Sequence, residues 1–467
     1  MPELPEVETV KESLKKHLLN RKILSVDVLY ERMILTDINE FKDSLKNTTI
    51  KDIRRKGKYL IFVFDNDKII VSHLRMEGKY LYFSEKENNT KHARVVFHLD
   101  NNEKAIYDDS RCFGTMELHN YSMLDNVPSL SKLGKEPMQM TKEELYSKLT
   151  NKSSFIKTAL LDQTIMAGLG NIYVDETLFE SKISPFKIAK EITLEECETI
   201  LKNASKILLN AIKEGGSTIS SYHPENGVDG RFQILLKAYG KQNTPCVNCH
   251  TILRKDECNG RGTVYCPNCQ GVAKRVGIYG KIASGKSTLN KYVMSKNYPV
   301  FSSDQFVNEL YLKSLPFKKQ LINLFGERIL NDNGSISKAE IKHIVAADIE
   351  KKRKLEQLIH PLVKKGIEKF IQMHRDNKII FLEIPLLFEA NCQKYCDYII
   401  GVNASEEVQI RNLKNRGSKN PYLDLQLNNT SQANKYLTKC DFIIENNYSL
   451  EELYSSCDEI IKIINKL

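Results

Sequence analysis

Four cysteines near the middle of the chain are spaced like the ligands of a metal ion. Cys246 and Cys249 form one CxxC pair, and Cys266 and Cys269 form a second pair after sixteen intervening residues. Two such pairs at this separation are typical of a closed, tetrahedral zinc site, whose binding energy stabilises the fold. We therefore predict one structural Zn²⁺ per chain, with no part in catalysis.

A second motif, GKIASGKST, begins at Gly280 and matches the pattern G-x-x-x-x-G-K-[ST] between a predicted strand and a predicted helix. In this motif backbone N–H groups wrap phosphates, Lys286 reaches the β and γ phosphates, and Ser287 binds Mg²⁺. The predicted residues of this nucleoside triphosphate site are Gly280, Lys281, Ile282, Ala283, Ser284, Gly285, Lys286, Ser287 and Thr288. On the motif alone a kinase, an ATPase and a GTPase are all open.

The start of the chain could carry a nucleophile. Removal of Met1, which is expected before a small residue, would leave a secondary amine on Pro2. An N-terminal amine titrates at about pH 7.7 to 8.0, so part of it is unprotonated at neutral pH and can attack carbon as lysine does in Schiff-base chemistry. Glu3 could supply or take the proton. The alternative is that Met-Pro-Glu is simply a common way to begin a protein.

Length and composition indicate several ordinary globular domains. The chain has 467 residues, 41% of them hydrophobic and 27% charged, and its net charge of +10 permits a polyanionic partner without requiring one. Eleven cysteines are too few for a disulfide-rich secreted protein. Because the sequence shows neither a secretory signal nor a run of about 18 apolar residues, we predict a cytoplasmic protein with no membrane partner.

The elements that would position these residues change along the chain. An amphipathic helix is predicted at 6–19, β-rich runs at 59–64, 68–74, 79–83, 93–99 and 104–108, helices from 141 to 214 interrupted at 168–171, and a Gly-, Ser- and Asn-rich loop at 215–230. Beyond residue 275 strands alternate with helices, which predicts a parallel α/β sheet. No Gly/Ser- or Pro-rich spacer separates the two patterns.

Six segments of the first part resemble the formamidopyrimidine-DNA glycosylases, bacterial enzymes that excise oxidised purines. In order they are MPELPEVET at 1–9, KGKYL with Lys58, HLRMEGK at 73–79, DDSRCFG at 108–114, GLGNIYVDE at 168–176 and GRGTVYCPNCQ at 260–270. The resemblance implies an antiparallel β-sandwich, a helix-two-turn-helix domain and a zinc finger. It also implies a partner, double-stranded DNA that carries 8-oxoguanine or formamidopyrimidines.

The resemblance implies a role for each catalytic residue. Pro2 attacks C1′ of the flipped nucleoside while Glu3 donates a proton, and the resulting imine permits β- and then δ-elimination. Lys58 is implied as a further proton donor and Arg261 as the donor for the second elimination. Both side chains are cations, so they also suit contacts with phosphate.

An enzyme that acts on a base in a duplex must extrude the nucleotide and fill the gap. The resemblance places Met76, Arg111 and Phe113 in that gap. It also implies DNA contacts for His92 and Asn171, although His92 could be an ordinary surface histidine. Taken singly, Met76 and Phe113 could equally be core residues and Arg111 a surface cation. A basic run such as KDIRRKGK at 51–58 is usually a solvated face. Because it ends on Lys58 a role facing DNA is also open, but only Lys58 within it is specified.

Segments of the second part resemble dephospho-coenzyme A kinase. They are VFSSDQFVNELY at 300–311, LIHPLV at 358–363, EIPLLFE at 383–389, VQIRNLKNRG at 408–417 and SQANKYLTKCDFIIEN at 431–446. The resemblance implies transfer of phosphate from ATP to the 3′-hydroxyl of dephospho-CoA, with Asp304 as the base and Arg416 at the ATP. Alternatively, Asp304 only caps a helix. Lys281 and Ala283 stand where the family has glycine, and Ser302 stands where it has aspartate, so nucleotide affinity could differ.

We predict a fusion of the two enzymes that acts as a monomer. The predicted domains are a β-rich catalytic domain at 1–135, a helix-two-turn-helix domain at 136–235, a zinc finger at 236–271 and a P-loop kinase at 275–467. Three alternatives stay open: a DNA-binding scaffold with one inactive half, a second half that phosphorylates another small molecule or nucleotide, and two neighbouring reading frames joined in one sequence.

Overall fold

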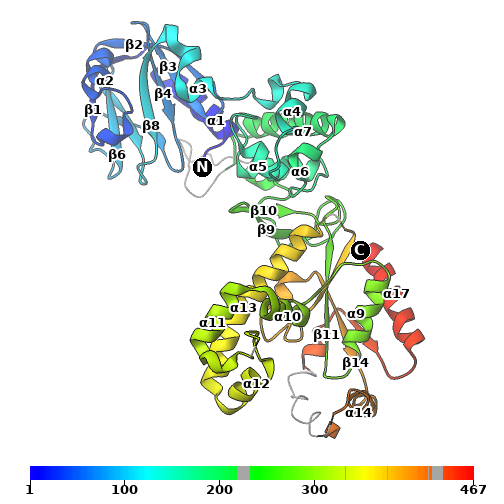
Figure 1. Ribbon diagram of the computed structural model, residues 1–467. Coiled ribbons are helices and arrows are strands. Elements are labelled where there is room, and N and C mark those ends of the chain that lie inside the picture. The colour runs from blue at the N-terminus through cyan, green and yellow to red at the C-terminus, as the bar shows by residue number, and fades with distance from the viewer. Residues whose placement is uncertain (218–231, 332, 376, 419, 423–434, 467) are drawn as a thin grey trace. The chain divides into compact units, whose positions relative to one another are not determined.

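The computed structural model describes residues 1–466 apart from 218–231, 332, 376, 419 and 423–434 (Figure 1). Most of the predicted loop at 215–230 and part of the segment at 431–446 lie outside the described residues. The chain divides into two compact units, Met1–Gln270 and Gly271–Leu467, which are described separately. Among the described residues, no helix is both long enough and apolar enough to cross a membrane.

The first unit begins with a helix packed on an antiparallel β-sandwich. One group of strands has the order β5-β7-β6-β1, the other has the order β2-β3-β4-β8, and two residue pairs between β1 and β2 join them. The bounds are α1 Leu4–Leu18, β1 Lys22–Val28, α2 Ile38–Leu45, β2 Thr48–Lys56, β3 Tyr59–Phe64, β4 Lys68–His73, β5 Lys79–Ser84, β6 Ala93–Leu99, β7 Glu103–Asp108 and β8 Thr115–Asn120. Apolar side chains from α1 and from both groups form one core, so burial holds α1 on the strands.

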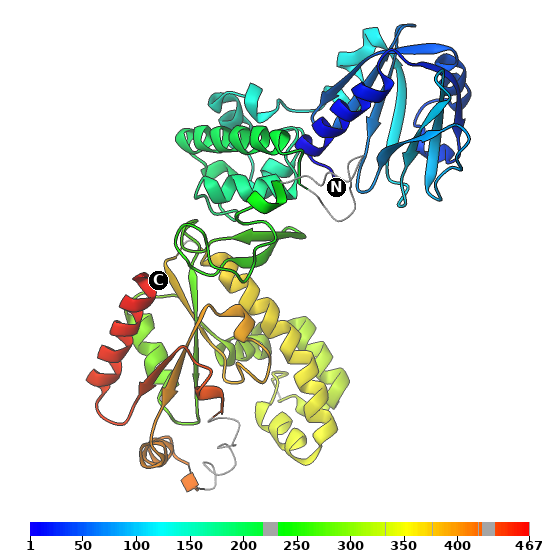
Figure 2. The same ribbon diagram turned by 180° about the vertical axis from the view of Figure 1, so that it is seen from behind.

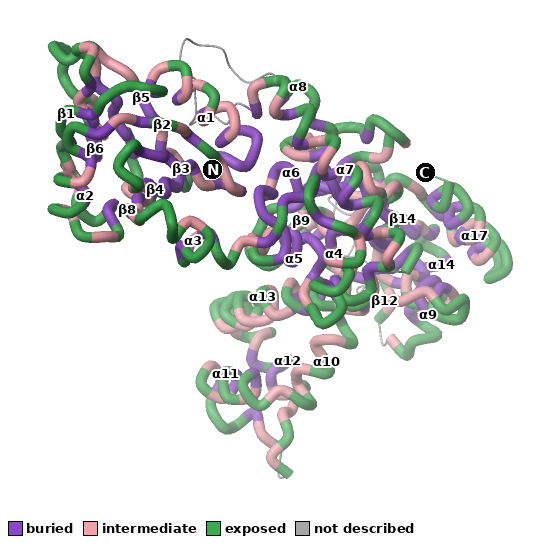
Figure 3. The backbone as a smooth tube through the Cα atoms, turned by 90° about the horizontal axis from the view of Figure 1, so that it is seen from above, coloured by how far each residue is buried: buried purple, intermediate pink, exposed green. Residues whose placement is uncertain are grey.

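The helical part of this unit surrounds one buried helix. Its bounds are α3 Pro128–Ser131, α4 Lys142–Leu149, α5 Ile156–Leu161, α6 Asn171–Glu180, α7 Leu194–Lys213 and α8 Phe232–Leu235. Residues 172–179 of α6 are all buried, as the purple tube in Figure 3 shows. Because α6 has no free surface along this stretch, its N-terminus is fixed in place. The strands β9 (Arg254–Cys258) and β10 (Arg261–Tyr265) form an antiparallel hairpin, and β10 contacts α6. The cysteine cluster packs against the same helix.

The second unit is a parallel five-stranded sheet, as predicted. The strand order is β12-β13-β11-β14-β15, with bounds β11 Lys274–Gly280, β12 Val300–Ser302, β13 Ile379–Glu383, β14 Tyr398–Asn403 and β15 Phe442–Glu445. The helices are α9 Lys286–Ser295, α10 Ser303–Lys313, α11 Leu315–Phe325, α12 Lys338–Ala347, α13 Ile349–Met373, α14 Glu406–Asn415 and α17 Leu450–Lys466. One apolar core joins the sheet to α9 and α17, and another joins it to α13, so helices cover both faces (Figure 2). In such sheets ligands bind at the carboxyl ends of the strands.

Candidate functional site

The carboxyl group of Glu3 lies against the N-terminus of α6. One of its oxygens accepts a hydrogen bond from the Ile172 N–H at 2.9 Å, and the other accepts from the N–H groups of Gly170 at 2.6 Å and Tyr173 at 3.3 Å. A Cβ on Gly170 would lie 2.3 Å from the Glu3 carboxyl carbon, so this approach requires glycine. Glu3 is only 2% exposed, and burial raises its pKa to about 7 although Lys58 and the N–H donors oppose the rise.

Lys58 and the start of the chain belong to the same buried site. Lys58 occupies the turn between β2 and β3 and is 5% exposed. Burial lowers its pKa, Glu3 and Glu6 counteract this, and Arg261 on β10 adds to the lowering. Pro2 is buried directly beside Glu3 in the chain. The structure therefore brings Lys58 and Arg261, which are far apart in sequence, to the start of the chain: Lys58 is coupled electrostatically to Glu3 and to Arg261.

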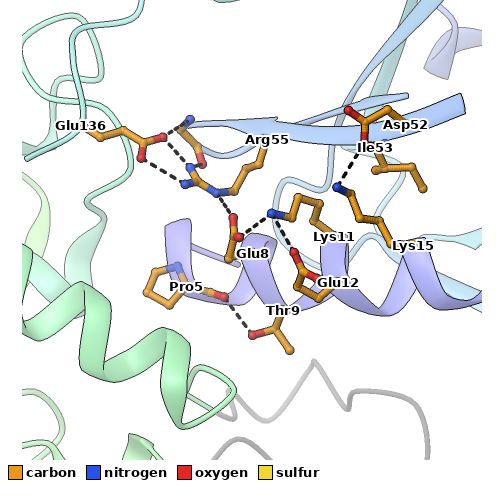
Figure 4. A network of polar contacts seen from close by, with 11 residues as sticks. Pro5, Glu8, Thr9, Lys11, Glu12, Lys15, Asp52, Ile53, Arg55 and Glu136 are labelled. Carbon is orange, nitrogen blue, oxygen red and sulfur yellow. Dashed lines mark hydrogen bonds and ion pairs between the residues drawn. The ribbon is translucent and has the colours of Figure 1, made fainter. Parts of the chain in front are cut away.

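Arg55 ties α1, which directly follows Glu3, to the β2–β3 turn that carries Lys58 (Figure 4). Its guanidinium donates to Glu8 of α1 at 2.6 Å, to both carboxylate oxygens of Glu136, and to the Gly57 carbonyl at 2.9 Å. Glu136 in turn accepts from the Gly57 N–H at 2.8 Å. The solvated-face interpretation of 51–58 therefore does not hold for Arg55, which is half-buried because two carboxylates balance its charge. The network fixes the turn that presents Lys58.

Met76, Arg111 and Phe113 are presented on two neighbouring turns. Phe113 is 52% exposed and the Arg111 guanidinium carbon lies 4.9 Å from its ring centre, so these two are surface residues rather than core. Met76 is 37% exposed, so it is not a core residue either. All three are therefore available to a partner.

Buried residues that sequence reasoning missed hold these turns. The Asp109 carboxylate is fully buried and accepts from the N–H groups of Arg111, Phe113 and Gly114 at 2.8 to 3.0 Å. A Cβ on Gly78 or on Gly114 would lie about 2 Å from the Tyr107 hydroxyl oxygen, which therefore separates the two turns. Asp109 lies within the DDSRCFG segment and the glycines lie beside predicted contact residues, which were the signals in the sequence.

His92 and Asn171 occupy different environments. His92 is half-buried in the turn before β6, where its carbonyl accepts from the Asp109 N–H at 3.0 Å, so it borders the turn that carries Arg111. Asn171 is the first residue of α6, and its side-chain amide donates to the Gly262 carbonyl of the hairpin at 3.1 Å. The Gly262 carbonyl also accepts from fully buried Lys157 at 2.9 Å. The hairpin residue next to Arg261 is thus fixed from two sides.

The four predicted zinc ligands converge at the base of the β9–β10 hairpin. Their sulfur atoms all lie within 4.8 Å of one another, with separations of 3.9 Å between Cys246 and Cys269 and 3.5 Å between Cys249 and Cys266. A tetrahedral zinc with Zn–S bonds of about 2.3 Å requires sulfur atoms about 3.8 Å apart, so the cluster fits Zn²⁺. Cys258 is buried in the same hairpin but is not part of the cluster.

Replacing Cys266 with serine should lower the zinc content of the purified chain from about one ion to near zero, because a serine hydroxyl is a poor ligand in a site built for thiolates. The measurement is release of zinc to a chromogenic chelator after denaturation. Cys258→Ser is the matched control, since it changes a buried cysteine of the same hairpin and should keep the ion. A full zinc content in the Cys266→Ser chain would contradict the four-ligand assignment.

The phosphate-loop residues occupy the predicted strand–loop–helix junction. Gly280 ends β11, Gly285 has φ +112° and Lys286 begins α9. The Lys286 ammonium donates hydrogen bonds to the carbonyls of Gly280 and Lys281. Burial lowers the pKa of Lys286 to about 8. Exposed Ser287 lies in the first turn of α9, where its hydroxyl could bind the Mg²⁺ that accompanies ATP.

Asp304 and Arg416 lie at the same end of the sheet as this loop. Asp304 is exposed at the start of α10, Arg416 is exposed directly after α14, and both influence the pKa of Lys286 electrostatically, in opposite directions. Ser302, the departure from the family pattern, donates from its hydroxyl to the Glu383 carboxylate at 2.6 Å. Glu383 ends β13, is buried and also acts on Lys286, so it is a residue of this site that sequence reasoning did not single out.

Comparison with known proteins matches this division of the chain. The models of the formamidopyrimidine-DNA glycosylase N-terminal domain and H2TH domain match residues 1–116 and 133–223, and the dephospho-CoA kinase model matches residues 274–452. A formamidopyrimidine-DNA glycosylase of Streptococcus pneumoniae is 43% identical over 272 residues, which are 58% of this chain and 99% of the relative. One of Mycoplasma genitalium is 41% identical over 281 residues, 59% of this chain and 98% of that relative.

Solved structures agree with the family matches of the first unit. A crystal structure of Lactococcus lactis Fpg in complex with DNA containing an abasic site is 39% identical, with a TM-score of 0.54 over 58% of this chain and 99% of that one. The first unit thus has the sequence and fold of a DNA glycosylase with a zinc finger. More particularly, the chain belongs to the formamidopyrimidine-DNA glycosylase family, and it continues into a dephospho-CoA kinase domain. Both resemblances and the fusion are confirmed.

Proposed function

We propose that the chain excises oxidised purines from double-stranded DNA and, with its second unit, phosphorylates dephospho-CoA at the expense of ATP. The observation that carries the first activity is the buried Glu3 carboxyl, held by three N–H groups at the N-terminus of α6 and coupled electrostatically to Lys58. The Lactococcus lactis relative is described in complex with abasic-site DNA and with DNA containing a Fapy-dG lesion, which supports the choice of DNA substrate.

In the glycosylase reaction the amine of Pro2, freed by removal of Met1, forms a bond to C1′ as the bond between C1′ and the base breaks. Glu3 supplies a proton, for which a pKa of about 7 is suited because the acid form is well populated at neutral pH. Burial lowers the pKa of Lys58, so it too can exchange a proton. Arg261 is the proposed donor for the second elimination.

DNA binding is proposed to rest on the exposed residues of the first unit. Met76 and Phe113 would fill the space of the extruded nucleotide, and Arg111 would hydrogen-bond the unpaired base. His92 and Asn171 are the remaining proposed DNA contacts. The zinc-bound hairpin orients Arg261 but takes no chemical part.

In the kinase reaction the loop from Gly280 to Thr288, with Lys286 and Arg416, is proposed to hold the ATP phosphates, and Ser287 the Mg²⁺. When bound, Mg²⁺ neutralises the charge of the transferring phosphate. Asp304 would accept the proton of the ribose 3′-hydroxyl. We further propose that the chain is monomeric and cytoplasmic, and that the domain bounds are 1–135, 136–235, 236–271 and 275–467.

The test is a pair of assays on the full chain. Borohydride reduction with a duplex carrying 8-oxoguanine should link the protein to DNA through Pro2, and ATP should phosphorylate dephospho-CoA. Absence of any adduct would refute the first activity. ATP binding without turnover on dephospho-CoA would instead support a second unit that has lost catalysis or acts on another substrate, an alternative favoured by the non-glycine residues of the loop.

A further inference from the structure

Four carbonyl oxygens of the phosphate loop each accept a hydrogen bond from a side-chain nitrogen. Lys286 donates to the carbonyls of Gly280 and Lys281 at 2.7 and 2.8 Å. Asn412 of α14 donates to the Ala283 carbonyl at 2.9 Å, and Asn446, which follows β15, donates to the Ser284 carbonyl at 2.8 Å. The Ser284 N–H donates within the loop, to the Lys281 carbonyl at 3.3 Å. With the four carbonyls held by side chains, the other loop N–H groups can face an anion.

One residue of the loop needs such support. Ala283 has φ +56°, in the left-handed region that side chains with a Cβ disfavour. It is 3% exposed and packs with Leu413 of α14, and Ile282 and Ile410 pack against this pair. The bond from Asn412 and this apolar contact together fix a backbone conformation that Ala283 would not hold alone.

Asn446 supports the loop at its other end. Gly285 has φ +112°, and a Cβ there would lie 2.3 Å from the Asn446 side-chain nitrogen. The amide is therefore packed directly against the glycine that precedes Lys286. The backbone N–H of Asn446 donates to the Asn403 carbonyl of β14 at 2.7 Å, so the side chain is anchored to the sheet.

Nucleotide binding would remove the hydrogen bonds that Lys286 donates to the loop carbonyls. Lys286 reaches the β and γ phosphates in the bound state, and its ammonium cannot keep both carbonyl contacts while it does so. The two asparagines then remain as the side-chain donors to the loop carbonyls. We propose that Asn412 and Asn446 are positioning residues that keep the phosphate loop in its anion-binding conformation, with Asn412 stabilising the left-handed Ala283. This inference rests on the proposed ATP-binding function.

The first measurement is ATP·Mg²⁺ binding to the full chain by calorimetry. Asn412→Ala and Asn446→Ala should each weaken binding by about five- to tenfold, the effect of losing one preorganising hydrogen bond. Asn415→Ala, an exposed residue of the same helix, is the matched control and should bind like the original chain. If the original chain does not bind ATP, the proposed function fails. If it binds and both variants bind equally well, the positioning role fails.

The second measurement separates positioning from general stability. Combining Ala283→Gly with Asn412→Ala should restore most of the lost affinity, because glycine adopts the left-handed conformation unaided. If Asn412 has a purely structural role, Asn412→Ala should lower the affinity for ATP by the same factor whether position 283 carries glycine or alanine. That result would overturn the proposal. Should Asn412→Ala unfold the second unit, Asn412→Asp keeps the shape but removes the donor. Undiminished affinity in that variant would equally overturn the proposal.

Discussion

Replacing Glu3 with glutamine should lower excision of 8-oxoguanine from duplex DNA by about 10²- to 10⁴-fold, the usual contribution of a positioned proton donor. The amide cannot donate a proton of comparable acidity. It also places an NH₂ group where the structure has an acceptor facing the N–H groups of Gly170 and Tyr173. Because buried donors without a partner are unfavourable, the local packing should loosen as well. The measurement is single-turnover release of the base.

The pH dependence of the original chain checks the same role. Glu3 faces Glu6 of the same helix, Lys58 from the β2–β3 turn and the terminal amine, and its pKa is raised from 4.5 to about 7. If its acid form is needed, excision should fall as the pH rises through 7. The folded state holds this proton more tightly than the unfolded chain does. The stabilisation is therefore complete below about pH 4.5 and is lost as the pH rises through about 7.

Two controls make the Glu3 result specific. Glu12→Gln alters an exposed carboxylate of the same helix and should leave excision unchanged. Dephospho-CoA kinase activity of the Glu3→Gln chain should also stay at its original level, which shows that the protein is intact. Excision within about threefold of the original rate would mean that Glu3 is not the proton donor.

Short local motifs allowed most of the proposed catalytic residues to be predicted. Their partners that are distant in sequence could not be predicted in this way. Pro2, Glu3 and Lys58 belong to short motifs, so their identity could be inferred from the sequence. The contact between Glu3 and α6 joins positions 167 and more residues apart. No periodicity predicts such a contact, because only the packing of a fully buried α6 decides where its N-terminus lies.

The strands β1, β2 and β8 were not among the predicted β-rich runs, and for β2 the cause is related. β2 carries Arg54, Arg55 and Lys56, so its charged residues concealed a strand whose Ile50 and Ile53 face the core. Arg55 is half-buried because Glu8 and Glu136 come from other elements to pair with it. The parallel sheet of the second unit was easier to predict, since its strands are buried apolar runs such as IIFLE.

Replacing Lys286 with alanine should lower phosphorylation of dephospho-CoA by at least about 10²- to 10³-fold, because one preorganised cation at the transferring phosphate contributes on that scale. The side chain that is removed also donates to the Gly280 and Lys281 carbonyls. Its loss should therefore weaken ATP binding as well as turnover. Both are measured on the full chain, by calorimetry and by formation of coenzyme A.

The fused architecture supplies an internal control for this second variant. The first unit has its own core and its own proposed catalytic residues, so borohydride trapping by the Lys286→Ala chain should equal that of the original chain. Lys291→Ala, which alters an exposed lysine of the same helix, should retain kinase activity. Undiminished turnover in Lys286→Ala would show that other cations hold the phosphates. Arg416 would then be the first to test, because it already acts electrostatically on the same position.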